Sequence, residues 1–283
     1  MKKIKKVFLP LWQGGSHSGI REMMDYLPLE NEDILINVKN ETEPTKDNIN
    51  NKTIVLKYCL MLYNHVDQIL HKNDFPLVIG GDHTIALGSI SAVRKHFSDL
   101  AVIWVDAHGD FNTPTSSPSK NPHGMILAAL MGQGDSEFVN LGFSGVKIKK
   151  ENIVLFDTRE LDEGELEIIK ANNIKVISHK YIQEFGLNQA LIEVSDYLKN
   201  KTSNLHISYD LDVLDPKLVP GVSVPVPSGL NTLELNEVID YLFVNFNVTS
   251  MDIVEYNPLF DKDNITLNLL KENINHIKKI KAN

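Results

Sequence analysis

The feature that most constrains the fold of this chain is an alternation of short apolar runs with longer amphipathic segments. The apolar runs span residues 6–12, 33–38, 75–81, 100–106, 152–157, 174–179, 205–212 and 248–257. Between many of them, apolar residues recur three and four apart, over residues 53–71, 84–97, 163–172, 188–200 and 232–246. Apolar strands alternating with helices predict a mostly parallel sheet that helices cover on both faces.

Composition narrows the class of protein. The 283 residues are 42% hydrophobic, which is enough for a sizeable core, and no repeat or linker divides the chain. We therefore expect a single domain over residues 1–283. The net charge of -9 disfavours nucleic acid or an anionic membrane as a partner. No apolar run approaches the ~18–20 residues that cross a membrane, and the start reads better as a strand than as a signal peptide, so we expect a cytoplasmic protein.

Side chains with metal-binding or acid–base chemistry follow four of the apolar runs. In chain order they are His83; Asp106, His108 and Asp110; Asp210, Asp212 and Asp215; and Glu255. In open parallel sheets, ligands bind beyond the carboxyl ends of the strands. The pattern therefore predicts that one edge of one sheet gathers these residues into a functional site.

The residue types at this edge favour a metal centre. Carboxylates with a minority of imidazoles, and no thiolate, suit a hard or borderline divalent ion such as Mn²⁺. Six ligands are more than one ion needs if water must also bind, so we expect two ions that share bridging carboxylates. The two-residue spacing in "DAHGD" and "YDLD" supports this, since alternate residues of an extended segment point to the same side.

Less specific interpretations apply to several neighbours. Asp215, which precedes Pro216, reads as a turn residue and is left out of the ligand set. Asp82 is expected to cap a helix or to support a ligand, and the Gly-rich residues 13–19 give only a weak hint of a phosphate cradle. The remaining histidines lack acidic motif neighbours and are expected at the surface or in packing: His17, His65, His71, His96, His179, His206 and His276.

The motifs "GGDHT", "DAHGD", "SYDLDVLDP" and "MDIVEYNP", in this order, resemble the ureohydrolase family of arginases and agmatinases, and bacterial arginases most of all. The resemblance runs from about residue 75 to 260, with matching elements on both sides. It implies a three-layer α/β/α fold, two Mn²⁺ ions per subunit and a homotrimer or homohexamer. One ion would be held by His83, Asp106, Asp110 and Asp210, and the other by Asp106, His108, Asp210 and Asp212.

The resemblance also implies roles around the substrate. The loop "DFNTPTSSPSKNPHG" is similar to the arginase loop, which is longer than that of agmatinases. Asn112 and Ser119 would bind the substrate's α-carboxylate, while His123 would shuttle protons. Asp162 and Glu165 would bind the α-amino group, Glu255 the guanidinium, and Asp110 is counted among the catalytic residues. Asp162 and Glu165 also fit a helix capping box, and the two roles can coexist.

The expected activity is hydrolysis of the guanidinium group of L-arginine to L-ornithine and urea. One departure from the family is Ser223-Val224, where Gly-Thr is usual, so a hydroxyl near the guanidinium is lost or is replaced by the neighbouring serine. Agmatine, guanidinobutyrate or an N-substituted arginine is the main alternative substrate. A relative with a single zinc that acts on acylated amines, or a non-catalytic metal-binding paralogue, is a more remote alternative.

Overall fold

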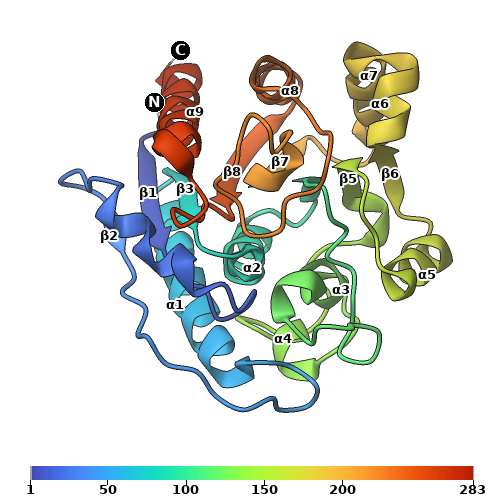
Figure 1. Ribbon diagram of the computed structural model, residues 1–283. Coiled ribbons are helices and arrows are strands. Elements are labelled where there is room, and N and C mark those ends of the chain that lie inside the picture. Colours follow the sequence, from blue (N-terminus) through green and yellow to red (C-terminus); the bar gives the residue numbers. More distant parts are fainter. Residues whose placement is uncertain (1, 283) are drawn as a thin grey trace.

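The computed structural model describes residues 2–282, and the described chain is built around one eight-stranded parallel sheet (Figure 1). The strand order is β2-β1-β3-β8-β7-β4-β5-β6. The strands are β1 Ile4–Leu9, β2 Ile34–Leu35, β3 Phe75–Gly80, β4 Ala101–Val105, β5 Ile153–Thr158, β6 Lys175–Ser178, β7 Asn204–Asp210 and β8 Asn247–Val254. Each predicted apolar run overlaps one of them, although β1 ends before Pro10, which has no amide hydrogen to donate to a ladder.

Each predicted helical segment forms a helix. The α-helices are α1 Lys52–His71, α2 Ala86–His96, α3 Ile126–Leu130, α4 Ser136–Val139, α5 Glu163–Asn172, α6 His179–Phe185, α7 Leu187–Leu198, α8 Thr232–Asn245 and α9 Ile265–Ala282. Short 3₁₀ helices span Ser18–Asp25, His83–Ile85, Pro122–Met125, Lys150–Asn152, Leu211–Val213 and Lys262–Asn264. The C-terminal helix α9 lies outside the predicted segments, although its buried Leu267, Leu270, Ile274 and Ile277 have helical spacing.

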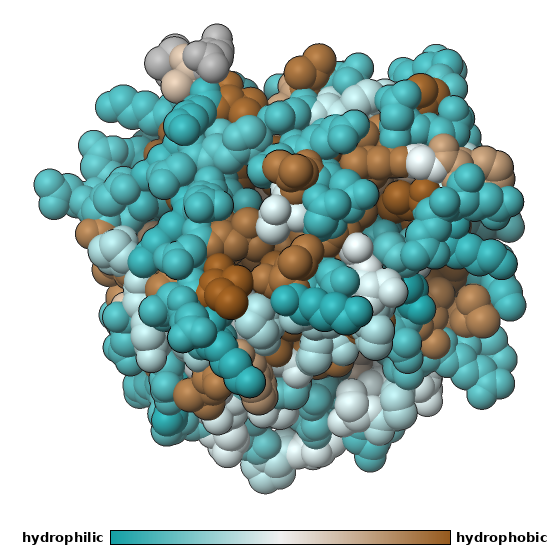
Figure 2. Space-filling view, turned by 45° about the horizontal axis from the view of Figure 1, so that its top comes forward, coloured by the Kyte–Doolittle hydropathy of each residue, from teal (hydrophilic) through white to brown (hydrophobic). Residues whose placement is uncertain are grey.

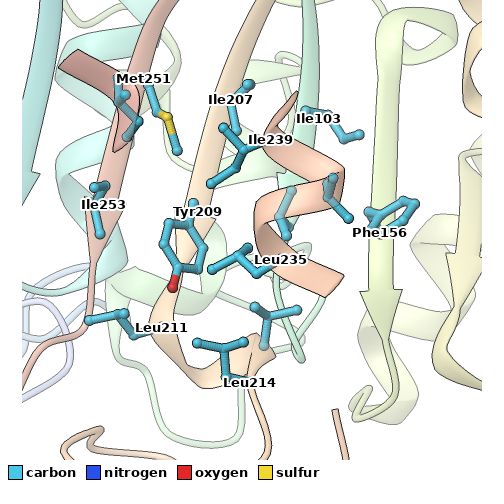
Figure 3. Packing of buried hydrophobic residues seen from close by; sticks show 14 of the residues in the cluster. Ile103, Phe156, Ile207, Tyr209, Leu211, Leu214, Leu235, Ile239, Met251 and Ile253 are labelled. Atoms are coloured by element: carbon cyan, nitrogen blue, oxygen red, sulfur yellow. The ribbon is translucent and has the colours of Figure 1, made fainter. Parts of the chain in front are cut away.

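The sheet separates two hydrophobic cores, which makes the fold three-layered as expected. On one face, residues of β7 such as Ile207 and Tyr209 pack with Leu235 and Ile239 of α8 (Figure 3). Helices α7 and α9 contribute to the same core. On the other face, Trp104 of β4 belongs to a core that also takes buried residues from α1, α2 and α3.

The topology brings the candidate residues together. The four strands that precede them, β3, β8, β7 and β4, are consecutive neighbours at the centre of the sheet. All of their pairings are parallel, so their carboxyl ends meet at one edge. The strand-end motifs, which are far apart in the sequence, therefore share one edge as predicted.

The surface seen in Figure 2 is mostly hydrophilic, with separate hydrophobic patches. Two of the most exposed apolar residues in the described chain, Leu233 and Val244, lie at the two ends of α8. Within residues 2–282, none of the helices combines the length and the apolar character that crossing a membrane requires.

Candidate active site

A cavity of about 390 Å³ opens at the carboxyl edge of the sheet, and every predicted site residue lines it. These residues are His83, Asp106, His108, Asp110, Asn112, Ser119, His123, Asp162, Glu165, Asp210, Asp212 and Glu255. The cavity contains far more carboxylate than basic groups, so it is suited to cations. Its floor is formed by the ends of β3, β4, β7 and β8, and its rim by the loop that follows β4.

Two overlapping groups of side chains at the floor have the composition and spacing of metal ligands. His83, Asp106 and Asp210 form one group, and Asp106, His108 and Asp212 form the other. Nδ1 of His83 lies 2.8 Å from Oδ2 of Asp106 and 3.1 Å from Oδ2 of Asp210. Nδ1 of His108 lies 3.0 Å from Oδ2 of Asp212. Asp106 belongs to both groups and therefore connects them.

Asp110 completes the first group, because its Oδ2 lies 3.3 Å from Nδ1 of His83. Burial raises the pKa of both Asp110 and Asp210 well above the usual range for a carboxyl, and neighbouring carboxylates raise it further. Such crowding of buried acids is costly unless a cation lies among them. Nδ1 of His83 and Oδ2 of Asp106 are also buried without an aligned hydrogen bond, so both lone pairs are available to a metal. The residues present thus fit a metal centre.

Local turns hold the carboxylates in place. Oδ1 of Asp106 accepts the N–H of His108 at 2.6 Å, and Oδ1 of Asp210 accepts the N–H of Asp212 at 2.8 Å. In both aspartates Oδ2 is the oxygen that faces His83. In the group around His83, the turn role that is common for an Asp after a strand and the ligand role therefore use different oxygens of the same side chain.

His83 is held on its other side. Its Nε2 lies 2.8 Å from Oγ of Ser208, and its ring stacks on Trp104 with centroids 3.8 Å apart. A hydrogen bond to the distal nitrogen fixes which imidazole nitrogen is free for a metal. Here the free nitrogen is Nδ1, which faces the carboxylates.

The backbone is strained at two of the candidate residues. Asp110 has φ of 52° and Glu255 has φ of 68°, in the left-handed region that favours glycine. Most other non-glycine residues with positive φ in the described chain are Asn, Asp or Ser. A glutamate in this conformation costs free energy, and such strain clusters at functional sites.

Glu255 and His123 form a pair beside the metal groups. Oε1 of Glu255 accepts the N–H of His83 at 3.0 Å and lies 3.5 Å from Nδ1 of His123. Burial alone would lower the pKa of His123, but the hydrogen bond and charge of Glu255 outweigh it and raise the pKa. Oε2 of Glu255 is buried without a partner. This free carboxylate oxygen is available to a cationic ligand.

The predicted carboxylate- and amine-binding residues lie together at the rim. Nδ2 of Asn112 donates to Oδ2 of Asp162 at 2.8 Å. Glu165 has both of its oxygens occupied, because Oε1 accepts the N–H of Phe111 and Oε2 the N–H of Asp162. Ser119 is exposed, and its hydroxyl accepts the N–H of Asn121 at 3.2 Å. Glu165 thus makes the helix-capping contact with the Asp162 backbone and also fixes the loop after Asp110.

Four polar residues that line the cavity are absent from the predicted set: His17, Ser117, Asn121 and Glu160. His17, expected at the surface or in packing, comes from the Gly-rich segment 13–19. Asp82 holds that segment, because its Oδ2 accepts the N–H of Gly15 at 2.9 Å while Oδ1 caps the helix at Thr84. Burial, helped by the charge of Glu255, raises the pKa of Asp82 to about 6. The Gly-rich pattern of residues 13–19 was the only sequence signal that this segment lies beside the cavity.

The departure at residues 223–224 has a clear structural outcome. Val224 lines the cavity, whereas the hydroxyl of Ser223 accepts a hydrogen bond from Nδ2 of Asn257 at 3.0 Å. The serine hydroxyl therefore does not replace the one that the family usually has here. Asp215, as expected, forms a turn by accepting the N–H of Lys217, outside the cavity.

Arg159 forms hydrogen bonds with three segments at the strand ends. Its side chain forms an ion pair of 3.1 Å with Asp157, which is fully buried. The guanidinium also donates to the backbone carbonyls of Asp157, Asp212, Val213, Val226 and Pro227. Gly229 permits this approach, because a Cβ there would lie 2.7 Å from Nη2 of Arg159. Arg159 therefore positions both Asp212 and the segment that carries Val224.

Replacing Arg159 with methionine is expected to weaken the binding of a divalent metal, tested with Mn²⁺, by roughly 10–100-fold, because Asp212 loses the contact that fixes its backbone. The measurement is titration of metal-free protein with Mn²⁺, alongside the melting temperature. Arg21→Met, which removes an exposed arginine whose nearest carboxylate is 3.9 Å away, is the matched control. Wild-type metal affinity in Arg159→Met, with only a lower melting temperature, would show that Arg159 does not position the ligand.

Comparison with known proteins agrees with the fold. The model of the "Arginase family" matches residues 18–277. An arginase of Staphylococcus aureus (strain MRSA252) is 46% identical over 206 residues, which are 72% of this chain and 68% of that protein. The crystal structure of an arginase from Bacillus subtilis superposes with a TM-score of 0.86 and 34% identity, covering 99% of this chain and 98% of the other.

A more distant match is the structure of Entamoeba histolytica arginase in complex with L-ornithine, with a TM-score of 0.83 and 25% identity over 98% of each chain. The parallel α/β/α fold, with an acidic, histidine-containing cavity at the carboxyl edge of its sheet, is typical of metal-dependent hydrolases. With these matches over most of its length, the chain belongs to the arginase family.

Proposed function

We propose that this protein hydrolyses the guanidinium group of L-arginine to give L-ornithine and urea. The observation that carries the proposal is the buried, unpartnered Oε2 of Glu255, in the same cavity as the two metal-ligating groups. An unpaired buried carboxylate is costly, and a planar guanidinium would satisfy it with charge-assisted hydrogen bonds. The similarity to proteins named arginase supports the same reaction.

The proposed cofactor is two Mn²⁺ ions per subunit. His83, Asp106, Asp110 and Asp210 would hold one ion, and Asp106, His108, Asp210 and Asp212 the other. Oxygen-rich donors with a few imidazoles and no thiolate support manganese over softer metals. When bound, the two ions supply the Lewis acidity that makes water a nucleophile near neutral pH.

The protein's own residues supply binding and proton transfer. Glu255 binds the guanidinium and so holds its carbon above the metal ligands. His123, whose raised pKa keeps its imidazole protonated to higher pH, delivers a proton to the amine that leaves as L-ornithine. The distance of 3.5 Å between Nδ1 of His123 and Oε1 of Glu255 supports a proton donor next to the bound guanidinium.

The rim of the cavity is proposed to bind the α-carboxylate and α-ammonium groups of the substrate. Asn112 and Ser119 bind the α-carboxylate, and the carboxylate of Asp162 binds the α-ammonium. Glu165 contributes mainly by positioning neighbouring residues, since both of its oxygens already accept backbone N–H groups. It holds Asp162 and the Asn112 loop in place and adds negative charge near the ammonium.

The test is urea release from Mn²⁺-loaded protein with L-arginine, agmatine and 4-guanidinobutyrate in parallel. L-Arginine is expected to be preferred, and Asn112→Ala should raise its KM by about tenfold or more, as expected for a lost hydrogen bond to a charged group. The KM for agmatine, which has no carboxylate, should not change. Thr115→Ala, in the same loop but outside the cavity lining, is the matched control.

One observation favours a second candidate substrate. Val224 gives the cavity an apolar wall where the family usually has a hydroxyl, and Ser223 does not compensate. A guanidino compound other than L-arginine is therefore the alternative. Preference for agmatine or 4-guanidinobutyrate in the same assay would overturn the assignment of the rim and leave the metal centre in place.

The oligomeric state is proposed from the family resemblance, and the location from the sequence pattern. We propose that the protein is cytoplasmic and assembles as a homotrimer or homohexamer, with a small guanidino molecule as its substrate. Light scattering coupled to size-exclusion chromatography would measure the number of subunits directly.

A further inference from the structure

A second cluster of metal-ligating side chains lies outside the cavity, between α1 and α2. It consists of Asp67 and His71 from α1 and His96 from α2. Oδ1 of Asp67 lies 2.7 Å from Nε2 of His96 and 3.5 Å from Nδ1 of His71. The two imidazoles meet edge to face, with centroids 4.8 Å apart. These histidines were expected to be surface or packing residues, yet they converge on one carboxylate.

The fold places this cluster far from the candidate active site. Helix α2 follows His83, crosses the sheet and ends at His96. Eleven residues at about 1.5 Å rise each separate its two ends by roughly 16 Å. Both histidines are the last residues of their helices, where the helix dipole favours positive charge. The cluster is thus a separate site at the amino edge of the sheet.

The geometry suits a tetrahedral ion. Two ligands bound to zinc at about 2.0–2.1 Å in tetrahedral geometry lie about 3.3 Å apart, and the distances of 2.7 and 3.5 Å bracket this value. Lys95 uses only Oδ2 of Asp67, at 3.0 Å, so Oδ1 remains directed at the histidines. Nδ1 of His71 also lies 3.0 Å from the backbone oxygen of Asp67, a contact that an ion would have to replace. The side chain of His71 is 63% exposed, which leaves room for the ring to turn and for a water as the fourth ligand.

Another acidic cluster provides a contrast. Asp47, Asp135 and Glu137 also meet the spacing of a metal site. The ammonium of Lys52 already lies 2.7 Å from a carboxylate oxygen of each. That position is filled by a cation of the protein itself. At Asp67, by contrast, Lys95 contacts Oδ2, whereas the two histidines contact Oδ1.

We propose that Asp67, His71 and His96 bind one late transition-metal ion, such as Zn²⁺, at a site separate from the metal centre in the cavity. Two imidazoles and one carboxylate favour zinc, nickel or copper, and Mn²⁺ is the weakest binder of the first-row series. The two sites therefore differ in metal preference. An ion bound here links the C-terminal ends of α1 and α2.

The experiment titrates Zn²⁺ into Mn²⁺-loaded protein by calorimetry, and measures retained manganese by elemental analysis after each addition. The expected result is one equivalent of Zn²⁺ bound without loss of manganese. His71→Ala and His96→Ala should each weaken this binding by about tenfold or more. His276→Ala is the matched control, because His276 also pairs with an aspartate at 2.7 Å but belongs to no three-residue group in the described chain.

Several outcomes would overturn the proposal. They are zinc uptake only in exchange for manganese, no uptake at all, or uptake that both His71→Ala and His96→Ala retain. Because the readout is metal content and heat, it does not depend on urea release. A failure of the zinc site is therefore distinguishable from a failure of the proposed hydrolase activity.

Discussion

Asp106→Asn is expected to lower urea release by about a thousandfold or more and to deplete the protein of bound manganese. Asp106 belongs to both metal-ligating groups, so an amide at this position should weaken metal binding by both groups. Loss of about 4 kcal/mol of transition-state stabilisation corresponds to a thousandfold in rate. Asparagine keeps an oxygen that can accept the N–H of His108, so the turn after β4 is preserved. Steady-state urea release and metal analysis on the same sample measure the two effects.

The chain offers a matched control for this variant. Asp215 also follows β7 and accepts an N–H two residues on, from Lys217, but it lies outside the cavity. Asp215→Asn therefore removes a charge from a similar turn and should keep both metal and activity. Full metal content and undiminished turnover in Asp106→Asn would show that this carboxylate does not bridge two ions.

The fold was predictable because its central strands are buried on both faces. Such strands read as continuous apolar runs, and the helices between them keep a period near 3.6. Helix α9 lay outside the predicted segments, because charged and polar residues interrupt its apolar positions. The limits of β1 depended on Pro10, a single residue that ends a ladder without changing the apolar pattern.

The floor of the cavity was predictable for a related reason. Parallel strands present their carboxyl ends at one edge, so short motifs after strands define a shared location. His17 and Asn121 come from loops, whose path no periodicity specifies. The contacts of Arg159 are mostly to backbone carbonyls, which leave no trace in the sequence. Glu165 was ambiguous because its capping contact and its place in the cavity use the same side chain.

Glu255→Gln tests the second role in the cavity, the binding of the guanidinium. Glutamine keeps the shape of the side chain and an oxygen to accept the N–H of His83, but it removes the negative charge. Breaking a buried ion pair costs about 3–5 kcal/mol, so kcat/KM should fall by roughly a hundredfold to several thousandfold. Because Glu255 belongs to neither metal-ligating group, manganese content should stay at the wild-type level.

The contrast between the two variants separates metal binding from substrate binding. Asp106→Asn should lose metal and activity together, whereas Glu255→Gln should lose activity with its metal in place. Glu272→Gln, on the exposed face of α9, controls for loss of a surface glutamate. If Glu255→Gln loses manganese, Glu255 acts through His83 and the metal centre. If it keeps wild-type kcat/KM, the free carboxylate oxygen does not bind the substrate, and the guanidinium must be held elsewhere in the cavity.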